Sequence, residues 1–155
     1  MIGNDLVDLQ QAATDSNWMR KGFLHKLFNA QEQQYIMLAS RPREMVWLLW
    51  SMKEAAYKID NKRSGIREFA PIKLACKLVT IANSHTEGQV NMDDRMYFTR
   101  STILAADHIH TIAAVNYESL GSIKSVITPS ACVNQHQQSS AACQSHHGRY
   151  LALIF

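Results

Sequence analysis

The pattern of hydrophobic positions predicts one long, enclosed helix near the middle of the chain. Between residues 42 and 60 hydrophobic side chains recur at spacings of three and four, and they occupy nearly every side of the predicted helix. Pro42 suits its first turn, where a missing N–H would have no partner in any case. A helix that is apolar nearly all round is usually central in its domain. We therefore expect the other elements to pack around residues 42–60.

The segments before this helix predict a strand and a shorter helix. Residues 1–9 (MIGNDLVDL) are short and alternate in character, which indicates a strand that runs into a turn. Asn29 can cap a second helix, because Glu32 follows three residues later as in a capping box. That helix should end near Ser40.

After Gly65 the hydrophobic period changes to two. Residues 72–78 alternate and predict a strand, and residues 96–104 and 109–116 are rich in β-branched and aromatic side chains. Residues 105–108 form a plausible turn between the last two. Together these segments predict an α+β fold in which a small antiparallel sheet packs against the long central helix.

The composition changes near the C-terminus. From Pro129 onward Ser, Gln, His and Ala dominate, and Arg149 is the only charged side chain. We expect a domain over residues 1–128 and a tail over 129–155 that is a weakly amphipathic helix or partly disordered. The tail contains Cys132, His136, Cys143 and His147, whose types suit zinc; their spacing matches no compact finger, and chance in a His- and Ser-rich tail explains them better.

Length and charge narrow the functional classes. The chain has 155 residues, the size of one domain, and 16 Lys plus Arg against 13 Asp plus Glu give a net charge of +3. This mild basicity suits an acidic partner or phosphates without proving either. We find no apolar run of ~18 residues and no signal-peptide pattern, and the three cysteines are an odd number, so we expect a cytoplasmic protein with reduced cysteines.

One acidic residue interrupts the apolar helix. Glu54 lies four residues from both Trp50 and Lys58, and a lone buried carboxylate costs several kcal/mol unless a cation or hydrogen bonds compensate. An ion pair with Lys58 is the simpler explanation, worth about 0.2–0.5 kcal/mol on an exposed face. The alternative is a Mg²⁺ and phosphate site that Glu54 shares with Asp5 and Asp8 from the strand end. The residues alone leave both open.

Two motifs resemble a known enzyme family. Residues 3–8 (GNDLVD) and 50–58 (WSMKEAAYK) resemble the paired signature of the 4′-phosphopantetheinyl transferases, a G-(I/V)-D strand end and a (F/W)-(S/C/T)-x-K-E-(A/S)-x-x-K helix. The second motif matches at every fixed position, whereas the first departs at Asn4. Residues 23–28 with Glu32 are similar to the holo-acyl carrier protein synthase branch. The resemblance covers about residues 1–117.

The resemblance implies an activity and a set of site residues. It implies Mg²⁺-dependent transfer of the 4′-phosphopantetheine arm of coenzyme A to a serine of an acyl or peptidyl carrier protein, with release of adenosine 3′,5′-bisphosphate. Asp5 and Glu54 would hold Mg²⁺, and Asp8 would ligate it directly or through water. Lys58 would contact the phosphates and assist the leaving group, with Lys53 as a second contact. Either Glu54 or a metal-bound water would take the serine proton.

Further positions carry over from the resemblance less directly. His108 would lie near coenzyme A, although His110 competes for the match and a turn histidine is the simpler interpretation. Lys62 and Arg63 would meet the 3′-phosphate, or form a solvated helix end. A basic group could face the acidic helix of the carrier protein, or be plain solvated surface: Arg20, Lys21 and Lys26.

The resemblance also implies an assembly, and two rival functions stay open. A single module of this length implies a homotrimer with coenzyme A at the subunit boundaries. One rival is an inactive family member that binds coenzyme A or a carrier protein. The other is a small basic nucleic-acid-binding module, against which stands the absence of a dense Arg/Lys face in the sequence. We therefore expect neither nucleic acid nor membrane as a partner.

Overall fold

A computed structural model describes residues 1–82, 84–104, 106–132 and 140–155. Five strands form an antiparallel sheet in the order β1-β5-β4-β3-β2. Their bounds are β1 (Ile2–Asp8), β2 (Ala75–Ile81), β3 (Thr86–Met92), β4 (Arg95–Leu104) and β5 (His108–Ala114).

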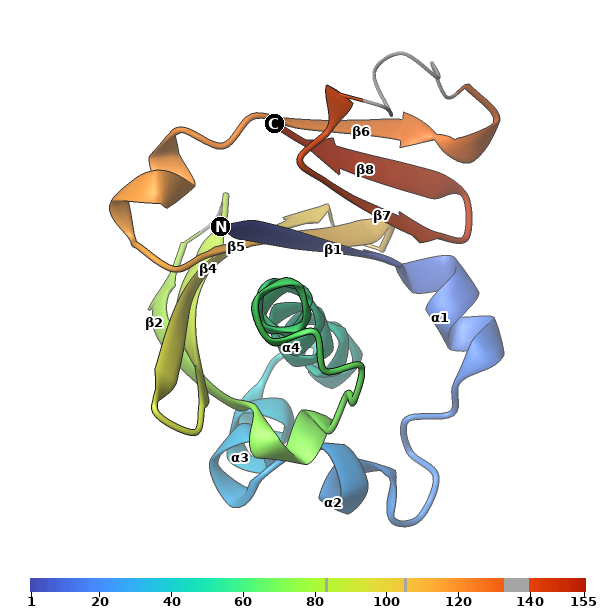
Figure 1. The fold of residues 1–155 in the computed structure, drawn as a ribbon. Helices are drawn as coiled ribbons and strands as arrows, with labels where there is room; N and C mark the ends of the chain where they lie inside the picture. The colour runs from blue at the N-terminus through green and yellow to red at the C-terminus, as the bar shows by residue number, and fades with distance from the viewer. Residues whose placement is uncertain (83, 105, 133–139) are drawn as a thin grey trace.

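The long helix α4 (Pro42–Ser64) lies against one face of this sheet, and the remaining helices surround its other sides (Figure 1). These are α1 (Leu9–Asp15), α2 (Phe23–Leu27) and α3 (Ala30–Leu38). The α+β architecture with a central helix is therefore confirmed.

The helix ends follow local sequence signals. Asn29 Oδ1 accepts the Glu32 backbone N–H at 2.9 Å, and Glu32 Oε2 accepts the Asn29 N–H at 2.8 Å, so the predicted capping box at the start of α3 is present. Helix α4 begins at Pro42 as predicted, but it continues past residue 60 to Ser64. Gly65, with a φ of 73°, ends it in the left-handed conformation that glycine tolerates best.

The sheet contains one strand more than the alternation predicted. Strand β3 was not expected, because its sequence TEGQVNM is mostly polar and contains a glycine. The strand predicted at residues 72–78 begins later, since Pro71–Lys73 forms a 3₁₀ turn. Residue 105, in the predicted turn before β5, lies outside the described residues.

The C-terminal segment forms a second sheet, in the order β6-β8-β7. Its strands are β6 (Ser125–Pro129), β7 (Cys143–His147) and β8 (Tyr150–Ile154), and they lie on the side of β1 away from α4 (Figure 1). The expectation of a helical or partly disordered tail is thus wrong for residues 140–155. The physical reason is the apolar run at 151–154, which is buried and pairs with a strand on each side.

Strand β1 and helix α4 approach each other unusually closely. A Cβ atom on Gly3 would collide with the carbonyl oxygen of Ala55, so only glycine permits this approach. The residues of α4 that face the core are fully buried, among them Leu49, Met52 and Ile59. This contact fixes the N-terminal strand beside the part of α4 that carries Glu54.

Candidate active site

A cleft of about 940 Å³ opens between strand β1, helix α4 and the second sheet. Its volume lies within the range of about 300–1,000 Å³ typical of small-molecule sites. Helix α4 contributes the face that the spacing of three and four predicted: Trp47, Trp50, Glu54 and Lys58. Other lining residues come from β1, from the loop after α4 and from β7, including Asp5, Val7, Phe69, Ser145, His146 and His147.

The two carboxylates predicted to meet do line the same cleft. Burial raises the pKa of the Asp5 carboxyl above its ordinary value, although Lys58 opposes the shift. Burial and, after it, the nearby Asp5 raise the pKa of Glu54 to about 7. The charge of Asp5 thus disfavours the charged form of Glu54, and a bound cation would relieve this repulsion.

One carboxylate oxygen of Asp5 lacks a hydrogen-bond partner among the described residues. Oδ1 accepts from Lys58 Nζ at 3.1 Å, whereas the buried Oδ2 has no partner of hydrogen-bond geometry among the described residues; the Ser51 hydroxyl, which also lacks such a partner, still lowers the pKa of Asp5. A buried oxygen without a partner is costly, and a bound metal ion or ligand would satisfy it.

Lys58 crosses from the helix to both sheets. Its Nζ donates to the Asn4 carbonyl oxygen at 2.8 Å, to Asp5 Oδ1 at 3.1 Å and to Ser145 Oγ at 3.0 Å. All three donors of the ammonium group are thereby used. The ion pair that the helix pattern suggested between Glu54 and Lys58 is not among the salt bridges of the described residues; Lys58 pairs with Asp5 instead.

Lys53 lies elsewhere. Its side chain is 0 % exposed, and Nζ forms an ion pair with Glu32 Oε2 at 2.8 Å. The same nitrogen donates to the carbonyl oxygens of Leu27 at 3.0 Å and Pro71 at 2.8 Å. In this structure Lys53 therefore joins α4 to α3 and to the turns beside it, and it does not reach the cleft.

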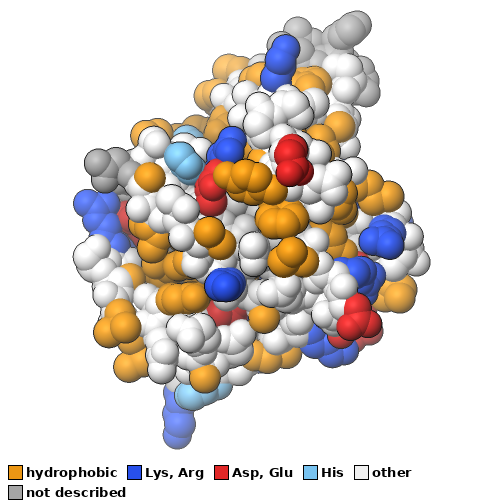
Figure 2. All heavy atoms as spheres, turned by 90° about the vertical axis from the view of Figure 1, so that its left-hand side faces the viewer, with side chains coloured by type: hydrophobic (Ala, Val, Ile, Leu, Met, Phe, Trp, Pro, Cys, Tyr) orange, Lys and Arg blue, Asp and Glu red, His pale blue; other side chains and the backbone are white. Residues whose placement is uncertain are grey.

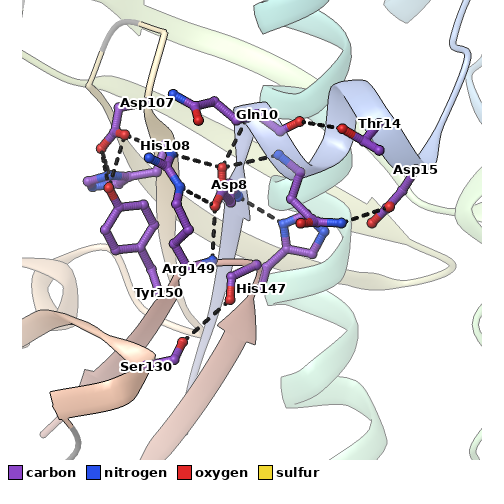
Figure 3. Close-up of polar contacts among 12 residues, drawn as sticks. Asp8, Gln10, Thr14, Asp15, Asp107, His108, Ser130, His147, Arg149 and Tyr150 are labelled. Carbon is purple, nitrogen blue, oxygen red and sulfur yellow. Dashed lines mark hydrogen bonds and ion pairs between the residues drawn. The ribbon is translucent and has the colours of Figure 1, made fainter.

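The side chain of Asp8 points toward Arg149 of the second sheet (Figure 3). Its Oδ1 caps helix α1 by accepting the N–H groups of Gln10 and Gln11, and its Oδ2 accepts from Arg149 Nε at 2.8 Å. The Arg149 guanidinium holds the pKa of this carboxyl well below its usual range. With both oxygens engaged, Asp8 is not brought together with Asp5 and Glu54.

Arg149 is the centre of a polar cluster that we call the Arg149 network: Asp8, Asp107, His108, Arg149 and Tyr150 (Figure 3). Arg149 Nη2 pairs with Asp107 Oδ1 at 2.9 Å. The Tyr150 hydroxyl donates to Asp107, and Asp107 Oδ2 lies 2.8 Å from Nδ1 of His108. The network fastens the turn between β7 and β8 to the ends of β1 and β5.

Neither predicted histidine is among the described residues that line the cleft. His108 belongs to the Arg149 network. His110 is buried, its Nε2 is 3.5 Å from the Asn4 amide, and burial lowers its pKa to about 4. His110 is therefore neutral at physiological pH.

The other predicted basic residues lie at the surface. Lys62 donates to the Ala142 carbonyl oxygen at 3.1 Å, beside a shallow pocket that Lys58 also lines, and Arg63 is exposed at the end of α4. Arg20, Lys21 and Lys26 are exposed and together line a hollow at the start of α2. The structure thus gathers this basic group in one place, and none of the three residues lines the cleft.

Sequence reasoning missed Ser145. Its hydroxyl group contacts both Asp5 and Lys58 from strand β7, a segment that composition had marked as a poorly structured tail. The alternation of the smaller Cys143 and Ser145 with the larger Gln144 and His146 was the available signal in the sequence. Of the four residues with zinc-ligand types, His136 lies outside the described residues. His147 Nδ1 accepts the Asp8 backbone N–H at 2.9 Å.

Comparisons with known proteins identify the family. In the described part of the chain no helix is long and apolar enough to cross a membrane. No curated protein sequence matches the chain significantly. Among solved structures, the crystal structure of Thermotoga maritima holo-[acyl-carrier-protein] synthase matches with a TM-score of 0.49 and 10% identity, covering 98% of this chain and 81% of that one. Residues 1–113 match the model of the 4′-phosphopantetheinyl transferase superfamily, and with this match over most of its length the chain belongs to that superfamily.

Proposed function

We propose that this protein transfers the 4′-phosphopantetheine arm of coenzyme A to a serine of an acyl or peptidyl carrier protein, with Mg²⁺ as cofactor. The observation that carries the proposal is the meeting of Asp5 and Glu54 in one cleft with Lys58 beside them. Membership of the superfamily supports the type of reaction.

The donor set of the cleft fits a magnesium ion. Carboxylate oxygens are the ligands that Mg²⁺ prefers, and it commonly takes one or two of them beside substrate phosphates. Asp5 Oδ2 has no partner within the described residues, and the pKa values of both carboxyls are raised. Asp5 and Glu54 would hold the ion, which when bound would neutralise negative charge on the pyrophosphate of coenzyme A.

The protein's own groups account for the proton and the leaving group. The carrier serine forms a bond from its oxygen to the β-phosphorus, the bond from that phosphorus to the bridging oxygen breaks, and adenosine 3′,5′-bisphosphate leaves. Glu54 lines the cleft and would accept the serine proton, directly or through a water molecule. Lys58 can stabilise the leaving phosphate if a phosphate oxygen replaces one of its three present acceptors.

Two features support the proposed partners. The basic group of Arg20, Lys21 and Lys26 is exposed and suits the acidic surface of a carrier protein. In Figure 2, Lys and Arg side chains are dispersed among acidic and hydrophobic ones on the face in view, which does not favour the nucleic-acid-binding alternative.

We also propose that the protein assembles as a homotrimer; light scattering that found an active monomer would contradict this assembly.

The test is incubation with coenzyme A, Mg²⁺ and an apo carrier protein, followed by intact mass measurement. The carrier should gain one phosphopantetheine, and EDTA or Glu54→Gln should prevent the gain. Lys77→Met, on the exposed side of strand β2, is the matched control and should leave the gain intact. If several carriers gain no mass while calorimetry shows coenzyme A binding, the inactive family member is the correct function.

A further inference from the structure

We propose that Ser145 is a positioning residue of the active site, which orients Asp5 for cation binding and anchors Lys58. This inference rests on the proposed function. It extends the site to strand β7, which lies beyond the residues 1–113 that match the family.

The Ser145 hydroxyl is saturated by hydrogen bonds. Oγ accepts the Leu6 backbone N–H at 3.2 Å and Lys58 Nζ at 3.0 Å, and it donates to Asp5 Oδ1 at 3.3 Å. A hydroxyl offers one donor and two acceptor sites, so each of its capacities is used once. Ser145 is only 7 % exposed, which shields these bonds from exchange with water.

This arrangement gives the two carboxylate oxygens of Asp5 different roles. Lys58 and Ser145 both engage Oδ1, and they prevent the carboxyl group from rotating. Oδ2 is thereby left as the oxygen without a partner among the described residues. Groups that orient a metal-binding carboxylate commonly influence metal affinity as strongly as about 10- to 100-fold.

Strand β7 is held in place by contacts of the residues that follow Ser145. Two residues later, His147 Nδ1 accepts the Asp8 N–H, and the Arg149 network then fastens the following turn to β1 and β5. The side chains of β7 therefore bond directly to the free edge of β1, the strand that carries Asp5. Ser145 is placed by a fixed segment and not by a loose end of the chain.

The test measures cation binding in the absence of coenzyme A, with Mn²⁺ as the probe and electron paramagnetic resonance of the free ion as the signal. Ser145→Thr and Ser145→Val have nearly the same shape and differ in the hydroxyl group. We expect Ser145→Val to bind Mn²⁺ roughly 10-fold more weakly than Ser145→Thr. Ser145→Ala should show the same loss relative to the original protein. Ser125→Ala, an exposed serine in the same small sheet, is the control.

The outcomes separate this inference from the proposed function. Thermal melting first establishes that each variant is folded. If the original protein binds Mn²⁺ and modifies a carrier, and folded Ser145→Val and Ser145→Ala bind Mn²⁺ as tightly as Ser145→Thr does, the positioning role is refuted while the function stands. If the original protein neither binds Mn²⁺ nor modifies a carrier, both the proposed function and the positioning role of Ser145 are refuted. A lower kcat for Ser145→Val, restored in Ser145→Thr, would support the positioning role.

Discussion

Replacing Lys53 by methionine separates a lysine of the core from a lysine of the active site. Methionine keeps an unbranched side chain of similar length and removes only the ammonium group. Glu32 would then lie buried, at 0 % exposure, without its cation, although it would keep the backbone N–H groups of Asn29 and Cys76 at 2.8 and 2.7 Å. Two backbone carbonyl groups would also lose their donor.

The magnitude follows from the burial of this pair. Removing one partner of a buried ion pair typically costs about 3–5 kcal/mol, because the remaining charge is uncompensated. A loss of about 4 kcal/mol is a large fraction of the stability of a typical domain, which is about 5–15 kcal/mol. For a chain of this size it corresponds to a melting temperature lower by roughly 8–16 °C.

Urea denaturation followed by tryptophan fluorescence measures the free energy of unfolding. The double variant Glu32→Gln/Lys53→Met should lose less than the sum of the two single variants, since it leaves no buried charge without a partner. Lys77→Met, at an exposed position of β2, should change stability by less than about 0.5 kcal/mol. Below the melting temperature, the folded Lys53→Met variant should retain transfer activity. Lost activity with unchanged stability would refute the assignment of Lys53 to the core.

Three further predictions concern the cleft. The folded protein holds the Glu54 proton up to about pH 7, whereas an ordinary glutamate releases it near 4.5, so the free energy of unfolding without Mg²⁺ should fall as the pH rises through this interval. Urea denaturation across that range measures this decrease. The decrease should disappear in Glu54→Gln and in the presence of excess Mg²⁺. Lys58→Ala should slow carrier modification roughly 10²- to 10³-fold, and Lys58→Arg should not restore it, because a planar guanidinium cannot meet the three acceptors of the ammonium; a near-normal rate in either variant would exclude the proposed role. Gly3→Ala should lower the free energy of unfolding by about 1–3 kcal/mol and weaken Mn²⁺ binding, because β1 must move away from the Ala55 carbonyl and take Asp5 with it; unchanged Mn²⁺ affinity would show that this contact does not position the site.

The sequence was sufficient to predict the central elements, because their signals are local. The capping box at Asn29, the proline at the start of α4 and the spacing of its cleft-facing residues each depend on neighbours within a few positions. Each of the paired motifs is also a local signal, and Asp5 and Glu54 from the two motifs line the same cleft.

The positions of Lys53 and Asp8, which differ from the predicted ones, are explained by the geometry of the helix and the strand that carry them. Lys53 is adjacent to Glu54 in the motif, but successive residues on a helix point about 100° apart, so the two side chains leave α4 in different directions. Asp8 is three positions from Asp5, and an odd separation on a strand puts the side chains on opposite faces. Motif membership alone therefore did not decide which of these groups share a site.

The contribution of Ser145 could not be predicted from local signals. It meets Asp5 across 140 positions of sequence, and the contact depends on a second sheet of short strands in which β7 itself is mostly polar. Polar composition was misleading because the apolar run of β8 pairs with both neighbouring strands and stabilises them.

Among the described residues, side chains of β7 and not another strand of the same sheet cover the edge of β1 at Leu6 and Asp8. The backbone amides of Leu6 and Asp8 donate to the side chains of Ser145 and His147. The amides of the alternate residues, Asp5 and Val7, face β5 in the antiparallel ladder. The two sets of amides should thus differ in their hydrogen exchange with solvent. The amide hydrogens of Leu6 and Asp8 would exchange whenever the C-terminal sheet detaches locally, whereas those of Asp5 and Val7 would exchange only when the main sheet opens. Alternate residues of one strand would then record two separate opening reactions of the same molecule.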